Sequence, residues 1–476
     1  MPYHPSYSAL VLQPDYSFAR AELGPYLLAT LCAHLAELAA LGLPGAGETL
    51  AAAEDLREFR WPAELPQEDL FFAIEAELQS RVGPAAAASM RLGISRNDVD
   101  MTAYRMWARA GLGRLQGQLL QLRGQLLGLA AGHVGTLMAA ETHHQPAQPE
   151  RLGHLWLAAA CLMARDQARL AGAFGRVNLC PLGAAALAGS VVPVDRRRMA
   201  LRLGFAAPME NTYDAVSAYD WVCEVAACSQ VLAVDLSRLV DNLVRWAAAG
   251  FLQLPDGLVQ GSSIMPQKRN PVIFEHVRAR ISGALGLASA LILAGHNTPY
   301  SDVNDPGAPS LPLLDELFSR LGSALQLLAL ALAQLGVRAG EWRSALDHSA
   351  VAASGLAEQL ALHLGSYPQA HHLTQLLLER LGRQGRQLGE LTAEDLAAVG
   401  APELSPEELR AATDPQAILE SHPTWGGPSE GETRRQLQAA AARLQEDAAA
   451  RLQEDAAAIQ PGEGPPRAAR LEPAAP

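Results

Sequence analysis

One short segment, residues 261–271, brings together side chains that could remove and stabilise a proton. It reads Gly-Ser-Ser-Ile-Met-Pro-Gln-Lys-Arg-Asn-Pro, so that Lys268 and Asn270 follow within eight residues of Ser262. Glycine and proline keep such a stretch out of regular structure, and we expect a mobile loop that closes over a ligand. A serine becomes a useful base when an ammonium group and backbone N–H groups stabilise its alkoxide. The alternative interpretation is a polar surface turn.

The same eleven residues resemble the signature loop of the fumarase/aspartase superfamily, and most closely that of the argininosuccinate lyase family. Members cleave a C–N or C–O bond beside a carboxylate and release fumarate. Gln267 favours the argininosuccinate branch, because fumarases usually have glycine there and adenylosuccinate lyases a bulkier residue. The resemblance covers about residues 20–440. A match of this length argues against an ordinary surface turn.

Elimination of an amine from a succinyl group needs a base for the carbon-bound proton, donors for the resulting dianion and an acid for the leaving nitrogen. The resemblance implies that Ser262 is the base and that Lys268 and Asn270 stabilise the dianion. It further implies that Ser263 and Gln267 bind the substrate.

A second segment, Glu-Thr-His-His-Gln-Pro-Ala-Gln-Pro at 141–149, resembles a substrate-binding motif of the same family. The resemblance implies that Thr142 and Gln145 contact substrate carboxylates and that His143 acts in proton transfer, a role that suits a group titrating near neutrality. It also implies that Glu275 pairs with this histidine and raises its basicity. Without the motif, the histidine would be interpreted as structural and the glutamate as a solvated charge.

The third segment is Ser95-Arg96-Asn97 followed by aspartate, which resembles the family's Ser-Arg-Asn-Asp. The resemblance implies that these three residues hold a dicarboxylate, because a guanidinium matches carboxylate geometry. Taken alone, the motif could be an ordinary helix cap. Arg196 is expected to make a further carboxylate contact, and Tyr300 matches a substrate-binding tyrosine of the family.

The chain departs from argininosuccinate lyases where they recognise the amino-acid end of the substrate. Polar family positions align here with Leu27 and Phe71, and the stretch after Tyr300 lacks the family's lysine and has Asn304 or Asp305 in place of its glutamine. A buried guanidinium without polar partners loses hydrogen bonds worth about 1.5–3 kcal/mol each. We therefore hypothesise that fumarate-releasing chemistry is kept on a different N-substituted aspartate.

The positioning elements are predicted to be helices. The chain is 476 residues long with 5% aromatic residues and abundant Leu, Ala, Gln, Glu and Arg, which predicts two or three helical domains. The resemblance implies an all-α, three-domain fumarase/aspartase-like fold, whose long central bundle merges into a tetrameric helix core with active sites shared between subunits. The expected divisions are 1–93, 94–340 with the loop, 341–436, and a helical extension and Pro-rich tail at 437–476.

Apolar periodicity predicts long bundle helices at about 98–138, 150–175, 214–250, 271–295 and 309–337. The first contains five glycines, each of which weakens a helix by up to ~1 kcal/mol, so packing must hold it together. We expect these small residues to let neighbouring helices approach closely. The end of the chain, 461–476, is Pro/Gly/Ala-rich and is predicted to be disordered.

Several classes of function are disfavoured. A net charge of −13 with scattered basic residues argues against nucleic-acid binding, and we expect no uncharged apolar run of the ~18 residues that suggest a membrane span. No signal peptide is expected, and five cysteines without a Cys-x-x-Cys pair indicate a reducing cytoplasm. The paired histidines 143–144 and 371–372 are poorly placed to chelate one ion, so neither a metal nor a cofactor is expected. The expected partner is a small dicarboxylate.

Other functions stay open within this interpretation. One is true argininosuccinate lyase activity, and others are an adenylosuccinate-type lyase or a cycloisomerase that uses the same loop without releasing fumarate. A fourth is a catalytically idle structural homologue, like the lens crystallins related to this family. Such a protein has no reason to keep the proposed catalytic residues together, so an enzyme is the favoured interpretation.

Overall fold

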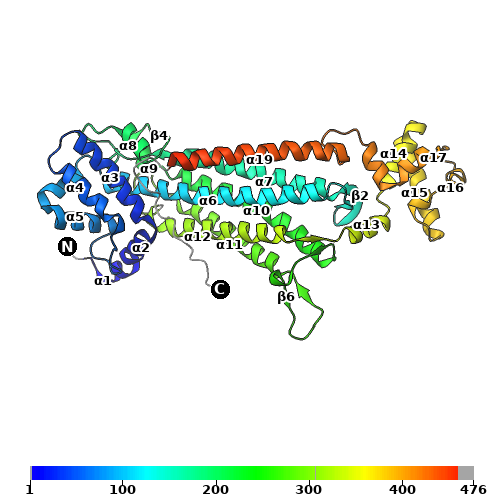
Figure 1. The fold of residues 1–476 in the computed structure, drawn as a ribbon, viewed down its shortest axis with the longest axis horizontal. Coiled ribbons are helices and arrows are strands. Elements are labelled where there is room, and N and C mark those ends of the chain that lie inside the picture. Colours follow the sequence, from blue (N-terminus) through cyan, green and yellow to red (C-terminus); the bar gives the residue numbers. More distant parts are fainter. Residues whose placement is uncertain (1–2, 306, 459–476) are drawn as a thin grey trace.

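The computed structural model describes residues 3–305 and 307–458, and it is an elongated, almost entirely helical molecule (Figure 1). Its axis is a bundle of long helices, with smaller helices gathered at each end (Figure 1). The all-α prediction is confirmed. The bundle helices are α6 (Arg96–Gly132), α7 (Leu152–Val177), α10 (Asp220–Ala248), α11 (Val272–Ala294) and α12 (Leu311–Ala333).

These helices agree with the five apolar-periodic stretches of the sequence, with one break. The stretch predicted at 214–250 divides into α9 (Thr212–Ser217) and α10, because the backbone turns extended at Ala218. Each long helix buries an apolar stripe against its neighbours, with α6 against α7 and α12, and α10 against α7 and α11. One continuous core runs through them.

Glycines in α6 do allow close approach, as expected. A Cβ on Gly111 would lie 2.4 Å from the ring of Phe318 in α12, and one on Gly113 would overlap a guanidinium of the C-terminal helix. Tight interdigitation of this kind stabilises a helix despite its glycine content. Gly117 and Gly128 have no atom near the corresponding position, and their role in this chain has no physical account.

The N-terminal end is built from short helices that share the bundle's core. They surround the start of α6 and include an irregular stretch with π-helical turns at Ser8–Leu12 and Ala19–Leu23. The helices are α1 (Pro5–Tyr7), α2 (Gln13–Phe18), α3 (Gly24–Ala40), α4 (Ala46–Asp55) and α5 (Leu70–Ala87), with α8 (Arg196–Arg202) beside them.

The other end carries a smaller group of helices with a hydrophobic core of its own, formed by residues between 352 and 418. They are α13 (Ala339–Asp347), α14 (Ala353–Leu364), α15 (Tyr367–Arg383), α16 (Ala393–Ala398), α17 (Pro406–Thr413) and α18 (Pro415–Ser421). Thr392 and Asp395 form a capping box at the start of α16.

The last helix, α19 (Glu430–Ala458), returns along the bundle beside α6 and α7 (Figure 1). It begins before the predicted division at residue 437 and is a packed part of the molecule. Buried Arg123 of α6 pairs with Asp447 at 2.6 Å, and Leu444 packs against the main core. The predicted disordered tail, 461–476, lies outside the described residues.

Short strands interrupt the helices in the connecting segments. They form four two-stranded ribbons, of which only the β3–β4 pair is parallel among the described residues. The strands are β1 (Leu137–Thr142), β2 (Gln145–Arg151), β3 (Leu179–Cys180), β4 (Ala207–Pro208), β5 (Leu252–Gln253), β6 (Gln260–Gly261), β7 (Arg269–Asn270) and β8 (Gly336–Val337).

The expectation that no segment is long and apolar enough to span a membrane is wrong by length and composition. Three helical stretches in the described chain meet that criterion: Pro5–Ala40, Val272–Ala294 and Ala308–Ala333. The first and third bury 67% and 56% of their apolar windows inside the molecule. The second, α11, buries only 28%, so much of its apolar surface has no cover within one chain.

Candidate active site

The loop that carries Ser262 is held at its base by a two-residue ribbon. Strands β6 and β7 pair antiparallel, with Gln260 opposite Asn270, and residues 262–268 form the connection. The Asn270 amide donates to the Gln260 carbonyl at 3.0 Å, and Arg269 pairs with Asp256. The predicted loop is therefore present, and it projects from the bundle (Figure 1).

Backbone donors already point at the Ser262 hydroxyl. The N–H groups of Met265 and Ile264 donate to its Oγ at 3.1 and 3.4 Å. Two amide donors on one oxygen are what an alkoxide requires, because they stabilise its negative charge without a further rearrangement. Within the described chain no hydrogen bond joins Lys268 to this oxygen, and Lys268, Ser263 and Gln267 are all exposed.

The histidine motif forms a β-hairpin, and His143 sits at its tip. Thr142 pairs with Gln145, and the two residues between them, His143 and His144, have φ of 52° and 62°. Positive φ at both central positions is the backbone of a tight two-residue hairpin turn, and histidine tolerates this region better than most residues. The turn therefore presents the His143 side chain to solvent.

An arginine that sequence reasoning missed braces this turn. Arg245, near the end of α10, contacts the His144 ring, and its Nη2 donates to Asn242 at 2.8 Å. The same guanidinium lies 4.0 Å from Glu141 and 3.2 Å from Asp241. No motif surrounds Arg245, so only the fold brings it to the hairpin.

Ser95 is the N-cap of a helix, which is the alternative interpretation of its motif. It begins α6 in a capping box, in which the Ser95 N–H donates to Asp98 at 2.9 Å. The other oxygen of buried Asp98 accepts from the N–H groups of Gly183 and Ala185 at 2.8 and 2.9 Å. Asp98 thus fastens the loop around 183–186 to the helix start, where the Asn97 amide also donates to Ala186 at 3.4 Å.

The remaining substrate-binding candidates at this end are occupied by protein groups. Arg96 pairs with Glu68 and Asp69, both at 2.8 Å. Arg196 donates to the carbonyls of Leu182 and Pro181 at 3.0 and 3.2 Å.

Tyr300 also has a protein partner. Its hydroxyl donates to Asp214 at 2.5 Å, and that hydrogen bond raises the pKa of Tyr300 to about 12. The proposed roles of Tyr300, Arg96 and Arg196 in substrate binding stay predictions.

The candidate residues form separate groups in one chain. Ser95 opens α6, while the hairpin with His143 follows its other end, and a helix of 37 residues is about 55 Å long. Similarly, α11 separates exposed Glu275, in its first turn, from Tyr300 beyond its last residue. No contact between Glu275 and His143 occurs in the described structure. One chain by itself therefore does not assemble the predicted site.

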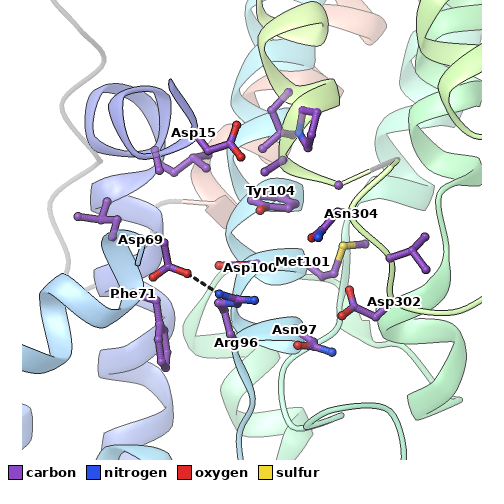
Figure 2. A pocket seen from close by; sticks show the side chains of 18 of the residues that line it. Asp15, Asp69, Phe71, Arg96, Asn97, Asp100, Met101, Tyr104, Asp302 and Asn304 are labelled. Carbon is purple, nitrogen blue, oxygen red and sulfur yellow. Dashed lines mark hydrogen bonds and ion pairs between the residues drawn. The ribbon is translucent and has the colours of Figure 1, made fainter. Parts of the chain in front are cut away.

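A cavity of about 250 Å³ lies at the start of α6 (Figure 2). Leu27, Phe71 and Asn304, the positions at which the chain departs from its family, all line it, and Arg96 and Asn97 border it. The same cavity is also lined by several carboxylates.

These carboxylates were not identified from the sequence, although for one of them, Asp100, the spacing from Arg96 is visible there. Arg96, Asp100 and Tyr104 stand four residues apart on α6, which places them on one helix face, and all three line the cavity. The other acids, Asp15, Glu68, Asp69 and Asp302, come from segments that only the tertiary structure brings near. Among the described residues, no group of three or more His, Cys, Asp or Glu is arranged to hold a metal ion.

Comparison with known proteins decides the family. A family model described as "Lyase" matches residues 21–286, more than half of the chain. This chain belongs to the lyase family. It is also 32% identical to "Argininosuccinate lyase 2" of Agrobacterium fabrum, over 92% of this chain and 90% of the relative. It is thus a divergent argininosuccinate lyase-like member of the fumarase/aspartase superfamily.

Solved structures share the fold. A variant of EDDS lyase with bound fumarate superposes with a TM-score of 0.80 at 24% identity, covering 96% of this chain and 93% of that one. The class II fumarase of Schistosoma mansoni superposes with a TM-score of 0.71 at 16% identity, covering 85% of this chain and 92% of that one. The family model and the sequence relative indicate, at a coarse level, a carbon–nitrogen lyase that releases fumarate.

Proposed function

We propose that this lyase eliminates an amine from an N-substituted aspartate, with Ser262 as the base that removes the carbon-bound proton. The observation that carries the proposal is the pair of backbone N–H groups at 3.1 and 3.4 Å from its Oγ. These donors lower the cost of forming the alkoxide. Lys268 lies on the same flexible connection and supplies a positive charge when the loop closes.

In this proposal His143 assists protonation of the leaving nitrogen, with Glu275 from a neighbouring copy as its partner. The hairpin tip exposes His143, and the first turn of α11 exposes Glu275, so both are available to another chain. Arg96, Asn97 and Ser95 hold the dicarboxylate. For Arg96, this requires that a substrate carboxylate compete with Glu68 and Asp69 for the guanidinium.

The active assembly is proposed to be a homotetramer whose sites are shared between subunits. Two observations support it: about 55 Å of α6 separates the two candidate groups, and α11 leaves apolar side chains such as Leu285 and Leu293 exposed. An uncovered apolar helix face of this length is expected to pack against another copy. A cytoplasmic location is proposed on the cysteine pattern of the sequence.

The substrate is proposed to be an analogue of argininosuccinate. Leu27 and Phe71 line the cavity beside the dicarboxylate-binding residues, where argininosuccinate lyases have polar side chains. In this proposal the residues that bind the fumarate-forming part of the substrate are the same as in the family, whereas this cavity binds a different leaving amine. Argininosuccinate itself, which an amidine lyase would cleave, is a further substrate to test at the same site.

The decisive experiment is fumarate formation by parent and Ser262→Ala proteins. Fumarate is followed by its ultraviolet absorbance during incubation with aspartate adducts, and in the reverse direction with fumarate plus amines. Removal of a catalytic base is expected to slow turnover by about 10²–10⁴-fold while the protein stays folded. An alanine variant as fast as its parent would refute the assignment of Ser262.

A further inference from the structure

The cavity at the start of α6 is strongly acidic. Among the described residues that line it are five carboxylates, and Arg96 is their sole basic neighbour. Two of the acids, Glu68 and Asp69, are paired with Arg96. The other three are Asp15, Asp100 and Asp302.

These three carboxylates have no partner among the residues that the structure describes. Neither a hydrogen bond nor an ion pair reaches Asp15, Asp100 or Asp302 from the described residues. Burial raises the pKa of Asp100 well above its ordinary value, and the charges of Asp69 and Asp302 raise it further. A carboxylate in such surroundings is costly to ionise unless a positive charge accompanies it.

The hydroxyl of a largely buried tyrosine opens into the same space. Tyr104 is only 9% exposed, lines the cavity one turn beyond Asp100, and has no hydrogen-bond partner in the described chain. Figure 2 shows Tyr104 between Asp15 on one side and Asp100 on the other, with Asp302 and Asn304 on the facing segment. Three unpartnered carboxylates beside a tyrosine hydroxyl that faces the cavity offer hydrogen-bond acceptors and negative charge to a cationic ligand.

The geometry favours an extended organic cation over a metal ion. The acids come from the N-terminal helices, α6 and the segment after α11, and no three of them are grouped as metal ligands in the described structure. A volume of about 250 Å³ is just below the ~300–1,000 Å³ of drug-sized pockets, which suits a small amine. Buried Leu27 and Phe71 offer apolar walls for its methylene groups.

We propose that this cavity selects a leaving amine that carries a second cationic nitrogen and no carboxylate, with Asp100 and Asp302 as its recognition residues. The proposal rests on the proposed function, because Arg96 and Asn97 at the cavity border hold the dicarboxylate end. Arginine, the leaving group of argininosuccinate, carries an α-carboxylate that these acids would repel. A diamine-type leaving group places its distal ammonium among them without that repulsion.

Three amines of matched skeleton separate the possibilities. The probe is 1,4-diaminobutane. Pentylamine replaces its distal ammonium by a methyl group, and ornithine adds a carboxylate to the same diamine. Binding of each is measured by titration calorimetry to the parent protein in the presence of succinate, which occupies the dicarboxylate site and cannot react.

We expect 1,4-diaminobutane to bind at least tenfold more tightly than pentylamine and ornithine. Asp302→Asn and Asp100→Asn are expected to weaken its binding at least tenfold each and to leave pentylamine unaffected. The matched control Asp347→Asn lies on α13, where Asp347 is exposed and pairs only with Arg343, and it should leave all three affinities unchanged. Equal binding of pentylamine or ornithine, no measurable binding of the diamine, or unaltered affinity in both cavity variants would overturn the proposal.

Consumption of fumarate with the same amines tells this failure apart from a failure of the proposed function. Turnover that needs Ser262 but shows no preference for the diamine would leave the chemistry standing and refute the cavity's selectivity. Selective diamine binding without turnover of any amine would support the cavity and refute the lyase mechanism.

Discussion

Hybrid oligomers offer the sharpest test of how the site is built. Arg96 is the first residue of α6 and His143 lies beyond the other end of this helix, whose 37 residues span about 55 Å, so one chain cannot bring both to one substrate. Each of the variants Arg96→Gln and His143→Asn is expected to be inactive. Asparagine is chosen for position 143 because it tolerates the positive φ of 52° that the hairpin requires.

Mixing the two inactive proteins should restore activity. A site takes Arg96 from one chain and His143 from another, and in a random mixture each is intact with a probability of one half. Recovery of about one quarter of the parent activity is therefore expected after subunits have exchanged completely. The assay is fumarate formation after joint unfolding and refolding, with mass spectrometry of the intact assembly to verify that hybrids exist.

A suitable control is a chain with both changes, mixed with the parent. There each active site needs both contributing chains to be parental, so the recovered fraction is again about one quarter, whereas each single variant refolded alone stays inactive. Verified hybrids of the two single variants that remain inactive would refute the separation of these residues between chains.

Two further predictions concern stability. Asp98→Ala removes the buried carboxylate that accepts from three backbone N–H groups and should lower the free energy of unfolding by about 3–5 kcal/mol, measured by urea denaturation at fixed protein concentration. A loss below about 1 kcal/mol, the effect expected of Asp347→Ala on the surface, would contradict the role of Asp98 in holding the 183–186 loop to the start of α6. The hydrogen bond to Glu150 raises the pKa of His154, so its stabilising contribution is present below the unfolded-state value near ~6.5 and is lost as pH rises through the folded-state value. The melting temperature of the parent should therefore fall more between about pH 6 and about pH 8 than that of His154→Ala, and parallel curves would exclude this linkage.

Local sequence information predicted the long helices well. Apolar periodicity in five stretches predicted five long helices, because the period and the length of such a pattern are properties of the chain itself. The structure has these helices as α6, α7, α10, α11 and α12. Turn residues likewise marked the loop at 261–271. The short ribbons were not anticipated, since strands of two residues are stabilised by their surroundings and leave no periodic pattern.

Motifs identified chemical types but not their geometry. Ser262 was selected from the sequence, and the structure adds the two backbone donors that make its role plausible physically. Arg196 was selected in the same way, yet its guanidinium holds loop carbonyls in this fold. A motif specifies which residue is present, whereas hydrogen-bond partners depend on segments distant in sequence.

The sequence by itself determined a helical lyase with a loop at 261–271 that carries Ser262, Lys268 and Asn270, because helix periodicity and motif spacing are local properties of the chain. Only the tertiary structure decided which surfaces meet: it separated Arg96 from His143 by the length of a helix and gathered Asp15, Asp100 and Asp302 around one cavity. The free energy of an ionised carboxylate depends on every charge and apolar wall around it, and those neighbours are assigned by packing between distant segments.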